Sequence, residues 1–349
     1  MAEQAQVTVA VDANGADLGP AEVAAGAALA AADGTRVLLF GPRAEIGAVP
    51  EGVTLIDSPV SIAKAADSFR AARSTPEASI VRAARAVAAG EADALVSGGS
   101  TGSALAAGFL HMRRARRIHR PALAMPLPVP GAPVLLLDVG ANSEARSEHL
   151  VQFAFMGAAL ASSVLGVTRP RVALLSNGEE PSKGTPQLVE AHERLAQRTE
   201  LNFVGNVEGT TMTAGAADVV VTDGFTGNVA LKLIEGVSQT VLRAIRDAAM
   251  STPRSRAGGA LLRPALGGLR EQIDPEGQGG AYMLGLRRLG VVAHGRFTRR
   301  GFANAIAVAQ RGVAERIVER TEQALAEAGA LRQSDSTVSD AGASVHARI

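Results

Sequence analysis

The sequence of 349 residues contains no cysteine and no tryptophan, and it has one tyrosine and nine phenylalanines. A chain without cysteine cannot form disulfides, bind zinc through thiolates or react through a cysteine thioester. So few aromatic rings provide no platform on which nucleic-acid bases could stack. The net charge of +1 gives no general attraction to a polyanion either. We therefore expect no nucleic-acid partner.

Long hydrophobic segments are also missing. No run approaches the ~20 apolar residues that a membrane-spanning helix needs. Residues 1–6 are polar and lack the basic and apolar regions of a signal peptide. We therefore expect a cytoplasmic protein that does not cross a membrane.

Short apolar runs alternate with longer amphipathic stretches over most of the chain. Val7–Val11 and Val134–Asp138 are typical of buried strands, whereas Pro20–Ala32 and Phe225–Ala249 have helical spacing. Strands that are apolar throughout and separated by helices predict a mainly parallel, doubly wound sheet. Right-handed crossovers place helices on both of its faces. We therefore expect a three-layer α/β/α fold, with one large domain over residues 1–330.

Two segments interrupt this rhythm. Residues 331–349 lack apolar periodicity and are expected to form a disordered tail. Residues 253–281 are rich in glycine, proline and arginine and are the predicted excursion from the main body. Leucines at helical spacing within them predict a short basic amphipathic helix, with Pro264 in its first turn.

Glycine, acidic, amide and hydroxyl residues follow six of the predicted strands. Ligands of open α/β sheets bind beyond the carboxyl ends of strands, and a helix N-terminus offers free N–H groups to an anion. One such turn is explained as well by tight loop geometry, but six together predict a shared anion pocket. Its candidate phosphate-binding residues are Asp12, Gly15, Ser97, Gly99, Ser100, Thr101, Gly102, Asn142, Glu179, Glu180, Gly205, Asn206 and Gly227.

None of these turns has the residue order of a cofactor fingerprint. Residues 97–102 read S-G-G-S-T-G, and the basic segment Arg113–Arg120 stands where an acidic residue would hold a ribose hydroxyl, which weakens an NADP site without removing it. Gly178–Gly184 is not a Walker loop, because its lysine precedes the last glycine. No metal-like spacing relates His111, His119, His149, His192 and His346. We expect neither a cofactor nor a metal.

Taken together, these motifs resemble those of the PlsX-type phosphate acyltransferases. The resemblance runs from about Val7 to Ala328 and is carried by Asp138–Asn142 with Glu148–Ala154, Gly178–Gly184, Gly205–Gly209, Asp223–Val229, and Gly279–Ala281 with Ala293–Gly295. Two motifs depart from the family pattern. Asn14 and Ala16 replace Met and Gly in D-A-M-G-G-D, and Ser100 replaces Asn in S-A-G-N-T-G.

The resemblance implies a reaction between acyl-acyl carrier protein and inorganic phosphate. The product would be acyl phosphate, made at the start of phospholipid synthesis for a downstream glycerol-phosphate acyltransferase. The resemblance also implies a homodimer and a fold like those of isocitrate and isopropylmalate dehydrogenases and phosphotransacetylases.

Four residues are candidates for the chemistry. Lys183 could neutralise phosphate or polarise the thioester carbonyl. Asp223 could orient the lysine or the phosphate, and Asn228 could donate a hydrogen bond or only cap a helix. His294 could be a general acid for the leaving thiol or a structural histidine. Because the chain has no cysteine, direct attack in a ternary complex is simpler than an acyl-enzyme route.

Charge is unevenly distributed along the chain. The segment Arg243–Arg300 holds eleven arginines against four acidic residues, an excess of +7. A basic face would steer an acidic carrier protein, and a basic amphipathic helix can lie on the inner face of the cell membrane. The same helix could pack in a dimer or form the acyl groove. The surface candidates are Arg256, Leu262, Arg263, Leu266, Leu269 and Arg270.

Three other functions use similar features. A phosphotransacetylase-like enzyme would transfer a short acyl group between CoA and phosphate. An NAD(P)-dependent dehydrogenase of related fold would need a cofactor site. A non-catalytic phosphate- or lipid-binding regulator would bind anions without turnover.

Overall fold

The computed structural model describes residues 6–127, 129 and 133–332, and one sheet runs through them. Its eleven described strands follow the order β3-β2-β1-β4-β11-β10-β5-β6-β9-β7-β8. The strands are β1 (Thr8–Asp12), β2 (Arg36–Gly41), β3 (Val53–Asp57), β4 (Ala94–Ser97), β5 (Ala122–Leu127), β6 (Val134–Leu137), β7 (Arg171–Leu175), β8 (Asn202–Val207), β9 (Val219–Val221), β10 (Ala281–Leu284) and β11 (Leu289–Val292).

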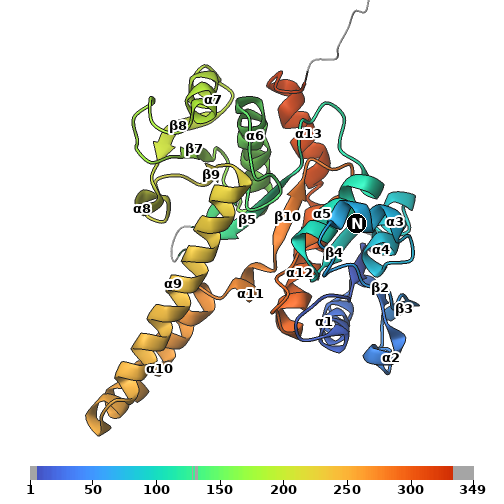
Figure 1. Cartoon of the computed structure of the whole chain (residues 1–349). Coiled ribbons are helices and arrows are strands. Elements are labelled where there is room, and N and C mark those ends of the chain that lie inside the picture. Colours follow the sequence, from blue (N-terminus) through green and yellow to red (C-terminus); the bar gives the residue numbers. More distant parts are fainter. Residues whose placement is uncertain (1–5, 128, 130–132, 333–349) are drawn as a thin grey trace, which may run out of the picture.

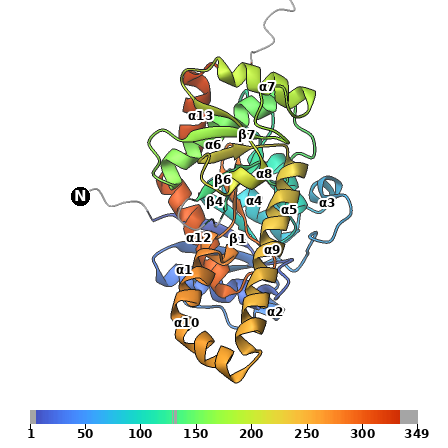
Figure 2. The same cartoon turned by 90° about the vertical axis from the view of Figure 1, so that its left-hand side faces the viewer.

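Helices cover both faces of this sheet (Figures 1 and 2). One face carries α1 (Pro20–Ala32), α6 (Ser147–Val164), α7 (Pro186–Ala196), α12 (Arg299–Ala314) and α13 (Ile317–Glu327). The other carries α4 (Ser79–Ala89), α5 (Thr101–Ala107), the π-helix η1 (Gly108–Met112), α8 (Gly209–Met212) and α9 (Gly224–Met250). The remaining helices are α2 (Arg43–Ile46), α3 (Ser68–Ser74), α10 (Pro253–Gln272) and α11 (Pro275–Gln278).

The sheet consists of two parallel halves that run in opposite directions. Strands β3, β2, β1, β4 and β11 are parallel to one another, and so are β6, β9, β7 and β8. The halves meet through β10 and β5, which pair antiparallel with each other and with β11 and β6 respectively. Leu137, at the carboxyl end of β6, therefore pairs with Ala124 near the amino end of β5. As a result, the carboxyl ends of the two halves point in opposite directions, but those of β6 and β11 lie at nearly the same level, because Leu137 is connected through Ala124 and Tyr282 to Val291.

The predicted three-layer α/β fold with a mainly parallel sheet is confirmed, although some of its elements differ. The sequence interpretation missed β5, which contains Pro126, and β10, which has only four residues. The apolar periodicity of Ala303–Ala328 is that of one helix, but the segment forms two, because Arg316 adopts a φ of 52° between α12 and α13. The single domain stays a prediction, and residues 333–349 of the predicted tail lie outside the described part of the chain.

The predicted excursion is an arm made of two antiparallel helices. After α9, the chain turns into α10 and the pair extends away from the sheet (Figure 1). The predicted helix start at Pro264 is wrong: α10 begins at Pro253, where the Thr252 side chain accepts the Ser255 N–H at 3.0 Å, and Pro264 lies inside the helix. Along α10 no residue is buried. No helix in the described ranges is long and apolar enough to span a membrane.

Two glycines of α9 allow the contact between this helix and the sheet to be tested. A Cβ at Gly227 would overlap the backbone carbonyl oxygen of Asp138, whereas a Cβ at Gly236 would meet nothing within 4 Å. We expect Gly227→Ala to lower the free energy of unfolding by about 1–3 kcal/mol or more, because overpacking strains a close contact. Gly236→Ala should raise it by about 0.5–1 kcal/mol, because alanine favours a helix. Denaturation followed by circular dichroism measures both values, and equal effects would contradict the close contact.

Candidate functional site

A buried carboxylate organises the carboxyl ends of β1 and β4. Asp12 Oδ1 accepts the Ser79 hydroxyl at 2.6 Å, and Asp12 Oδ2 accepts the Ser97 hydroxyl at 2.9 Å. Asn14 Nδ2 donates to Ser58 O and to Ser79 Oγ, so the residue that departs from the family pattern joins the same network. Asp12 is 3% exposed and Ser97 is 1% exposed. Both residues therefore hold the turn, and neither presents its side chain to solvent.

The glycines and hydroxyls of this turn shape its surface. Gly15 has a φ of 87°, and a Cβ there would lie 3.1 Å from Gly99 Cα, so the two turns pack backbone to backbone. Ser100 is the N-cap of α5, and its Oγ accepts the Ser103 N–H at 3.2 Å. A cap is a role that serine fills as well as asparagine, which accounts for the second departure from the family pattern. Thr101 and Gly102 follow it and are exposed.

His294 lies at the same edge, after β11, together with residues that the sequence interpretation missed. Lys232 Nζ, from α9, is 3.3 Å from His294 Nε2 and 2.9 Å from Glu235 Oε2. These three side chains and Asp17 line a cavity of about 550 Å³. Burial, and then the charge of Lys232, lower the pKa of His294. The shift favours the neutral imidazole, so a smaller fraction of His294 carries the proton that the predicted general acid would donate.

After β6, the carboxylate of Asp138 accepts five N–H groups. Oδ1 accepts the backbone N–H groups of Leu123, Gly140 and Ala141 at 2.9–3.1 Å. Oδ2 accepts the backbone N–H and the side-chain Nδ2 of Asn142, each at 2.8 Å. Asn142 Nδ2 also donates to a backbone carbonyl at 2.8 Å. The Asn142 amide thus holds the loop in place, and both of its N–H groups already donate hydrogen bonds within the protein.

The N-terminus of α9 lies beside this loop. Asp223 is the N-cap of α9, and its carboxylate accepts the N–H and the hydroxyl of Thr226 at 2.8 and 2.7 Å. Asn228 Nδ2 donates to Val139 O at 3.0 Å and so ties α9 to the loop after β6. Asp223 thus caps the helix, while Asn228 holds the loop and still has a second N–H.

The loop between β7 and α7 presents Lys183. Asn206 is buried at the end of β8, where its Nδ2 donates to Glu180 O at 2.9 Å and its Oδ1 lies 2.9 Å from His192 Nδ1. The Lys183 N–H donates to the same Glu180 O at 3.0 Å. Lys183 is exposed and forms no ion pair with any residue that the structure describes. Gly205 precedes Asn206 with a φ of 97°, and Glu179 is exposed in the loop.

The predicted site residues divide into two groups, which α9 connects: Lys232 contacts His294 of the first group and lies one helical turn after Asn228 of the second. That they form one shared pocket stays a prediction. Residues 12–102 of the prediction and His294 lie at the carboxyl ends of β1, β4 and β11. Residues 142–228 lie at the carboxyl ends of β6, β7, β8 and β9, where Val221 of β9 pairs with Leu174 of β7. In the second group, the loops after β6 and β7 flank β9, from whose end the long helix α9 begins, and the loop after β7 carries the exposed lysine.

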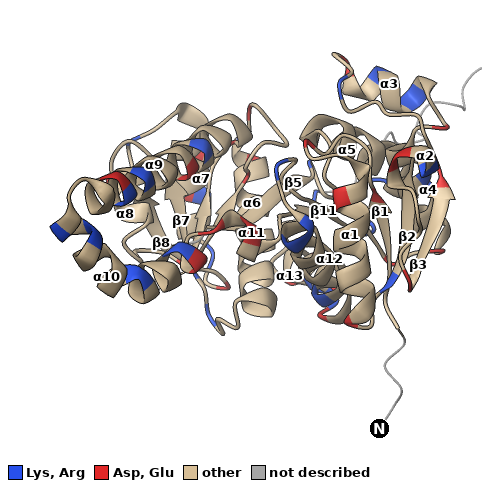
Figure 3. Cartoon of the chain, turned by 90° about the horizontal axis from the view of Figure 1, so that it is seen from below, with Lys and Arg blue, Asp and Glu red and all other residues tan. Residues whose placement is uncertain are grey.

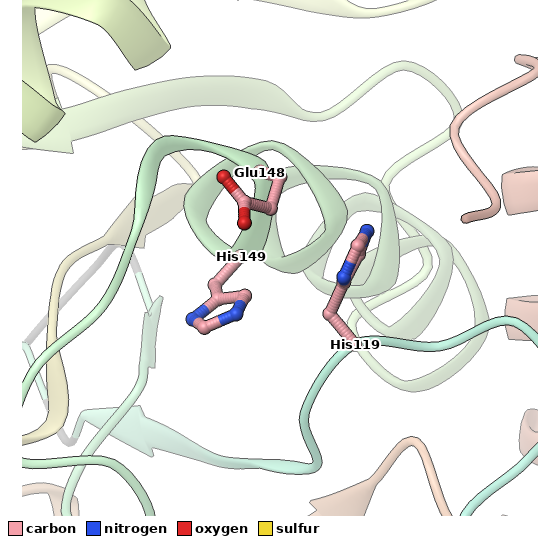
Figure 4. A group of neighbouring side chains, drawn as sticks. All are labelled: His119, Glu148 and His149. Atoms are coloured by element: carbon pink, nitrogen blue, oxygen red, sulfur yellow. The ribbon is translucent and has the colours of Figure 1, made fainter. Parts of the chain in front are cut away.

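A further group of side chains meets at the start of α6, where the neighbours Glu148 and His149 lie close to His119 from an earlier loop. Possible ligand atoms of His119, Glu148 and His149 lie within 4.8 Å of one another, an arrangement that histidine spacing could not reveal (Figure 4). His149 Nδ1 accepts the Arg146 N–H at 3.2 Å, so a neutral ring keeps its proton on Nε2. Arg146 Nη1 also lies 3.8 Å from Glu148 Oε1. Both contacts disfavour a cation, and we assign no metal to this group.

Solved structures share this fold. A phosphotransacetylase from Streptococcus pyogenes has a TM-score of 0.58 at 16% identity, covering 89% of this chain and 94% of that one. A 4-hydroxythreonine-4-phosphate dehydrogenase from Klebsiella pneumoniae has a TM-score of 0.52 at 14% identity, covering 88% and 100%. The chain thus has the fold seen in phosphotransacetylases, as the sequence resemblance implied.

Sequence similarity defines the chain further. Residues 7–320 match the family described as fatty acid synthesis protein. A phosphate acyltransferase from Lactococcus lactis subsp. cremoris (strain SK11) is 41% identical over 305 residues, covering 85% of this chain and 92% of that protein. One from Moorella thermoacetica is 41% identical over 326 residues, covering 89% and 93%.

The chain belongs to this fatty acid synthesis protein family and is an acyltransferase of the phosphate acyltransferase type. The predicted family and enzyme class are confirmed. They decide against the dehydrogenase and the non-catalytic regulator.

Asp12 generates a prediction about stability and pH. Burial raises the pKa of its carboxyl from 3.8 to about 6, against the opposing effect of its hydrogen bonds. A folded-state pKa above the unfolded one stabilises the fold fully below the unfolded pKa, and this contribution is lost as pH rises through about 6. Relative to Asp12→Asn, the wild type should therefore lose about 1–3 kcal/mol of unfolding free energy between pH 4 and 7. Urea denaturation at each pH measures this difference, and parallel pH profiles would contradict it.

Proposed function

We propose that the enzyme transfers a fatty acyl group from acyl-acyl carrier protein to inorganic phosphate, giving acyl phosphate for phospholipid synthesis. The observation that carries the proposal is the position of exposed Lys183 in the loop after β7, the strand that pairs with β9, from whose end α9 begins, in a chain of the phosphate acyltransferase family. A free cation and a helix N-terminus both attract a phosphate dianion.

The second group of site residues supplies the geometry for this reaction. Asn206 holds the Glu180 carbonyl that also receives the Lys183 N–H, so the buried amide fixes the backbone of the lysine. Asn228 ties the first turns of α9 to the loop after β6. Lys183 and the second N–H of Asn228 would then contact the phosphate or the developing oxyanion, whereas Asn206 and Asn142 position the loops.

The chemistry requires little from the protein beyond positioning and charge. A phosphate oxygen forms a bond to the thioester carbonyl carbon, giving a tetrahedral oxyanion. The carbon–sulfur bond then breaks, the electron pair leaves with the thiolate, and acyl phosphate and the free carrier thiol are the products. Phosphate is already an anionic nucleophile, so the reaction needs neither a cysteine nor a general base. The protein contributes orientation and electrostatic stabilisation of the oxyanion.

We also propose that the enzyme is a cytoplasmic homodimer that contacts the carrier protein and the inner face of the membrane. A stripe of exposed apolar residues spaced by four runs along α9 and suits a second copy of the chain: Phe225, Val229, Leu233, Val237 and Val241. Leu261 and Leu262 of α10 are 84% and 58% exposed and suit a lipid surface. The arginines of the arm (Figure 3) suit an acidic carrier protein.

The chain has three lysines, which allows a matched test of the reaction centre. We expect Lys183→Ala to lower kcat/KM for phosphate by about 10²–10³-fold, because an oxyanion or phosphate partner is lost. Lys64→Ala removes an exposed lysine that follows Ala63 beside the Gly15 turn, in the other half of the sheet, and should stay within about twofold of wild type. Acyl phosphate trapped with hydroxylamine measures the rate. A loss of activity in Lys64→Ala together with full activity in Lys183→Ala would contradict the placement of the reaction centre at Lys183.

A comparison of donors tests the substrate. Palmitoyl-acyl carrier protein should give phosphate-dependent release of free carrier thiol at a rate at least tenfold above that with acetyl-CoA. The phosphotransacetylase fold keeps the short acyl-CoA reaction as the second candidate. Faster turnover of acetyl-CoA would favour that candidate, and wild-type enzyme without either product would end both.

A further inference from the structure

The arm made by α9 and α10 contains a groove that the reaction centre does not use. The space between the two helices is about 890 Å³, within the range of about 300–1,000 Å³ that is usual for ligand sites. Its apolar lining includes Leu242, Ile245, Met250 and Leu266. The groove therefore has the size and the lining of a site for a small hydrophobic ligand.

Five arginines surround this apolar lining, two from α9 and three from α10: Arg243, Arg246, Arg256, Arg263 and Arg270. The three from α10 are seven residues apart, which places them on one side of the helix. None of the five forms an ion pair with a residue in the described ranges. Like charges held together without counter-ions repel, and a bound anion relieves the repulsion.

The chemistry of the groove selects one class of occupant. Guanidinium groups bind phosphate through paired hydrogen bonds, and the apolar lining accepts a hydrocarbon chain. Leu261 and Leu262 are exposed and do not line the groove. The part of the arm best suited to a lipid or protein surface therefore lies outside the groove. The concave site instead suits a single amphipathic molecule.

We propose that the groove between α9 and α10 binds one molecule of long-chain acyl phosphate, with the chain on the apolar lining and the phosphate among the five arginines. The inference rests on the proposed function, because acyl phosphate is the product of that reaction. A site on the arm would hold the product away from water after it leaves Lys183.

Two adjacent glycines provide a matched test. Gly267 lines the groove and Gly268 does not, and a Cβ at either position would meet nothing within 4 Å. Leucine favours a helix more than glycine does, so neither Gly267→Leu nor Gly268→Leu should impair folding. Calorimetry with hexadecylphosphonate, a stable analogue used below its critical micelle concentration, measures binding to the full chain. Wild type should bind it, Gly267→Leu should weaken binding at least tenfold, and Gly268→Leu should stay within twofold.

Charge and chain length are tested with the same readout. The double variant Arg246→Ala/Arg263→Ala should weaken hexadecylphosphonate binding at least tenfold, whereas Arg254→Ala, which does not line the groove, should not. Palmitate and butylphosphonate should each bind at least tenfold more weakly than hexadecylphosphonate. Equal affinity for palmitate would overturn the phosphate assignment, and equal affinity for butylphosphonate would overturn the acyl-chain assignment.

Other occupants give different results. Binding only to phosphatidylglycerol vesicles, with none of the monomeric phosphonate, would make the groove a membrane surface and overturn the proposal. The proposal would also be overturned if Gly267→Leu lost carrier-protein binding or dimerisation while its affinity for hexadecylphosphonate stayed unchanged. Lys183→Ala should keep the groove affinity within twofold. If the wild-type enzyme makes no acyl phosphate, the proposed function fails. If the wild type is active but Gly267→Leu binds hexadecylphosphonate as tightly as wild type does, this inference fails.

Discussion

The carboxylate of Asp138 is the interaction on which the second half of the molecule depends. It accepts N–H groups from β5 and from the loop after β6, and so it fixes the place where the two oppositely directed halves of the sheet meet. Burial raises the pKa of this carboxyl, and the five donors oppose that shift. Removing the donors would leave a buried carboxylate without partners, which is unfavourable. The loop that carries Asn142 is therefore fixed before any ligand binds.

Helix α9 connects the Asp138 loop to the rest of the molecule. It begins against the Asp138 loop, where Gly227 allows close contact, and then follows one face of the sheet. One helical turn after Asn228, Lys232 contacts His294 of the other half of the sheet, and the helix continues beyond the sheet as the first half of the arm. One rigid element thus connects the proposed reaction centre, the cavity around His294 and the arginine-lined groove.

The sequence predicted the fold class and most strands and helices, because apolar runs and helical spacing are local patterns. It missed β5 and β10, since a proline-containing strand and a four-residue antiparallel strand have weak local signals. It named Asn142, Asp223 and Asn228. The cap that Asp223 forms with Thr226 is local, but Asn142 and Asn228 hold loops through Pro121 and Val139, which are distant in the chain. Lys232 carries no motif of its own and became visible only through its contact with His294.

By itself, the sequence determined the α/β class, the family and the glycine-rich turns, because composition, periodicity and motif order do not depend on how elements are arranged. The tertiary structure decided which turns share an edge. The antiparallel pairing of β5 with β6 and β10 reverses the second half of the sheet, so that Asp12 and Ser97 lie at strand ends that point the opposite way from those before Asn142 and Asp223. That reversal results from long-range strand pairing, for which no single segment carries a signal. The groove of the arm likewise exists only because α10 folds back on α9.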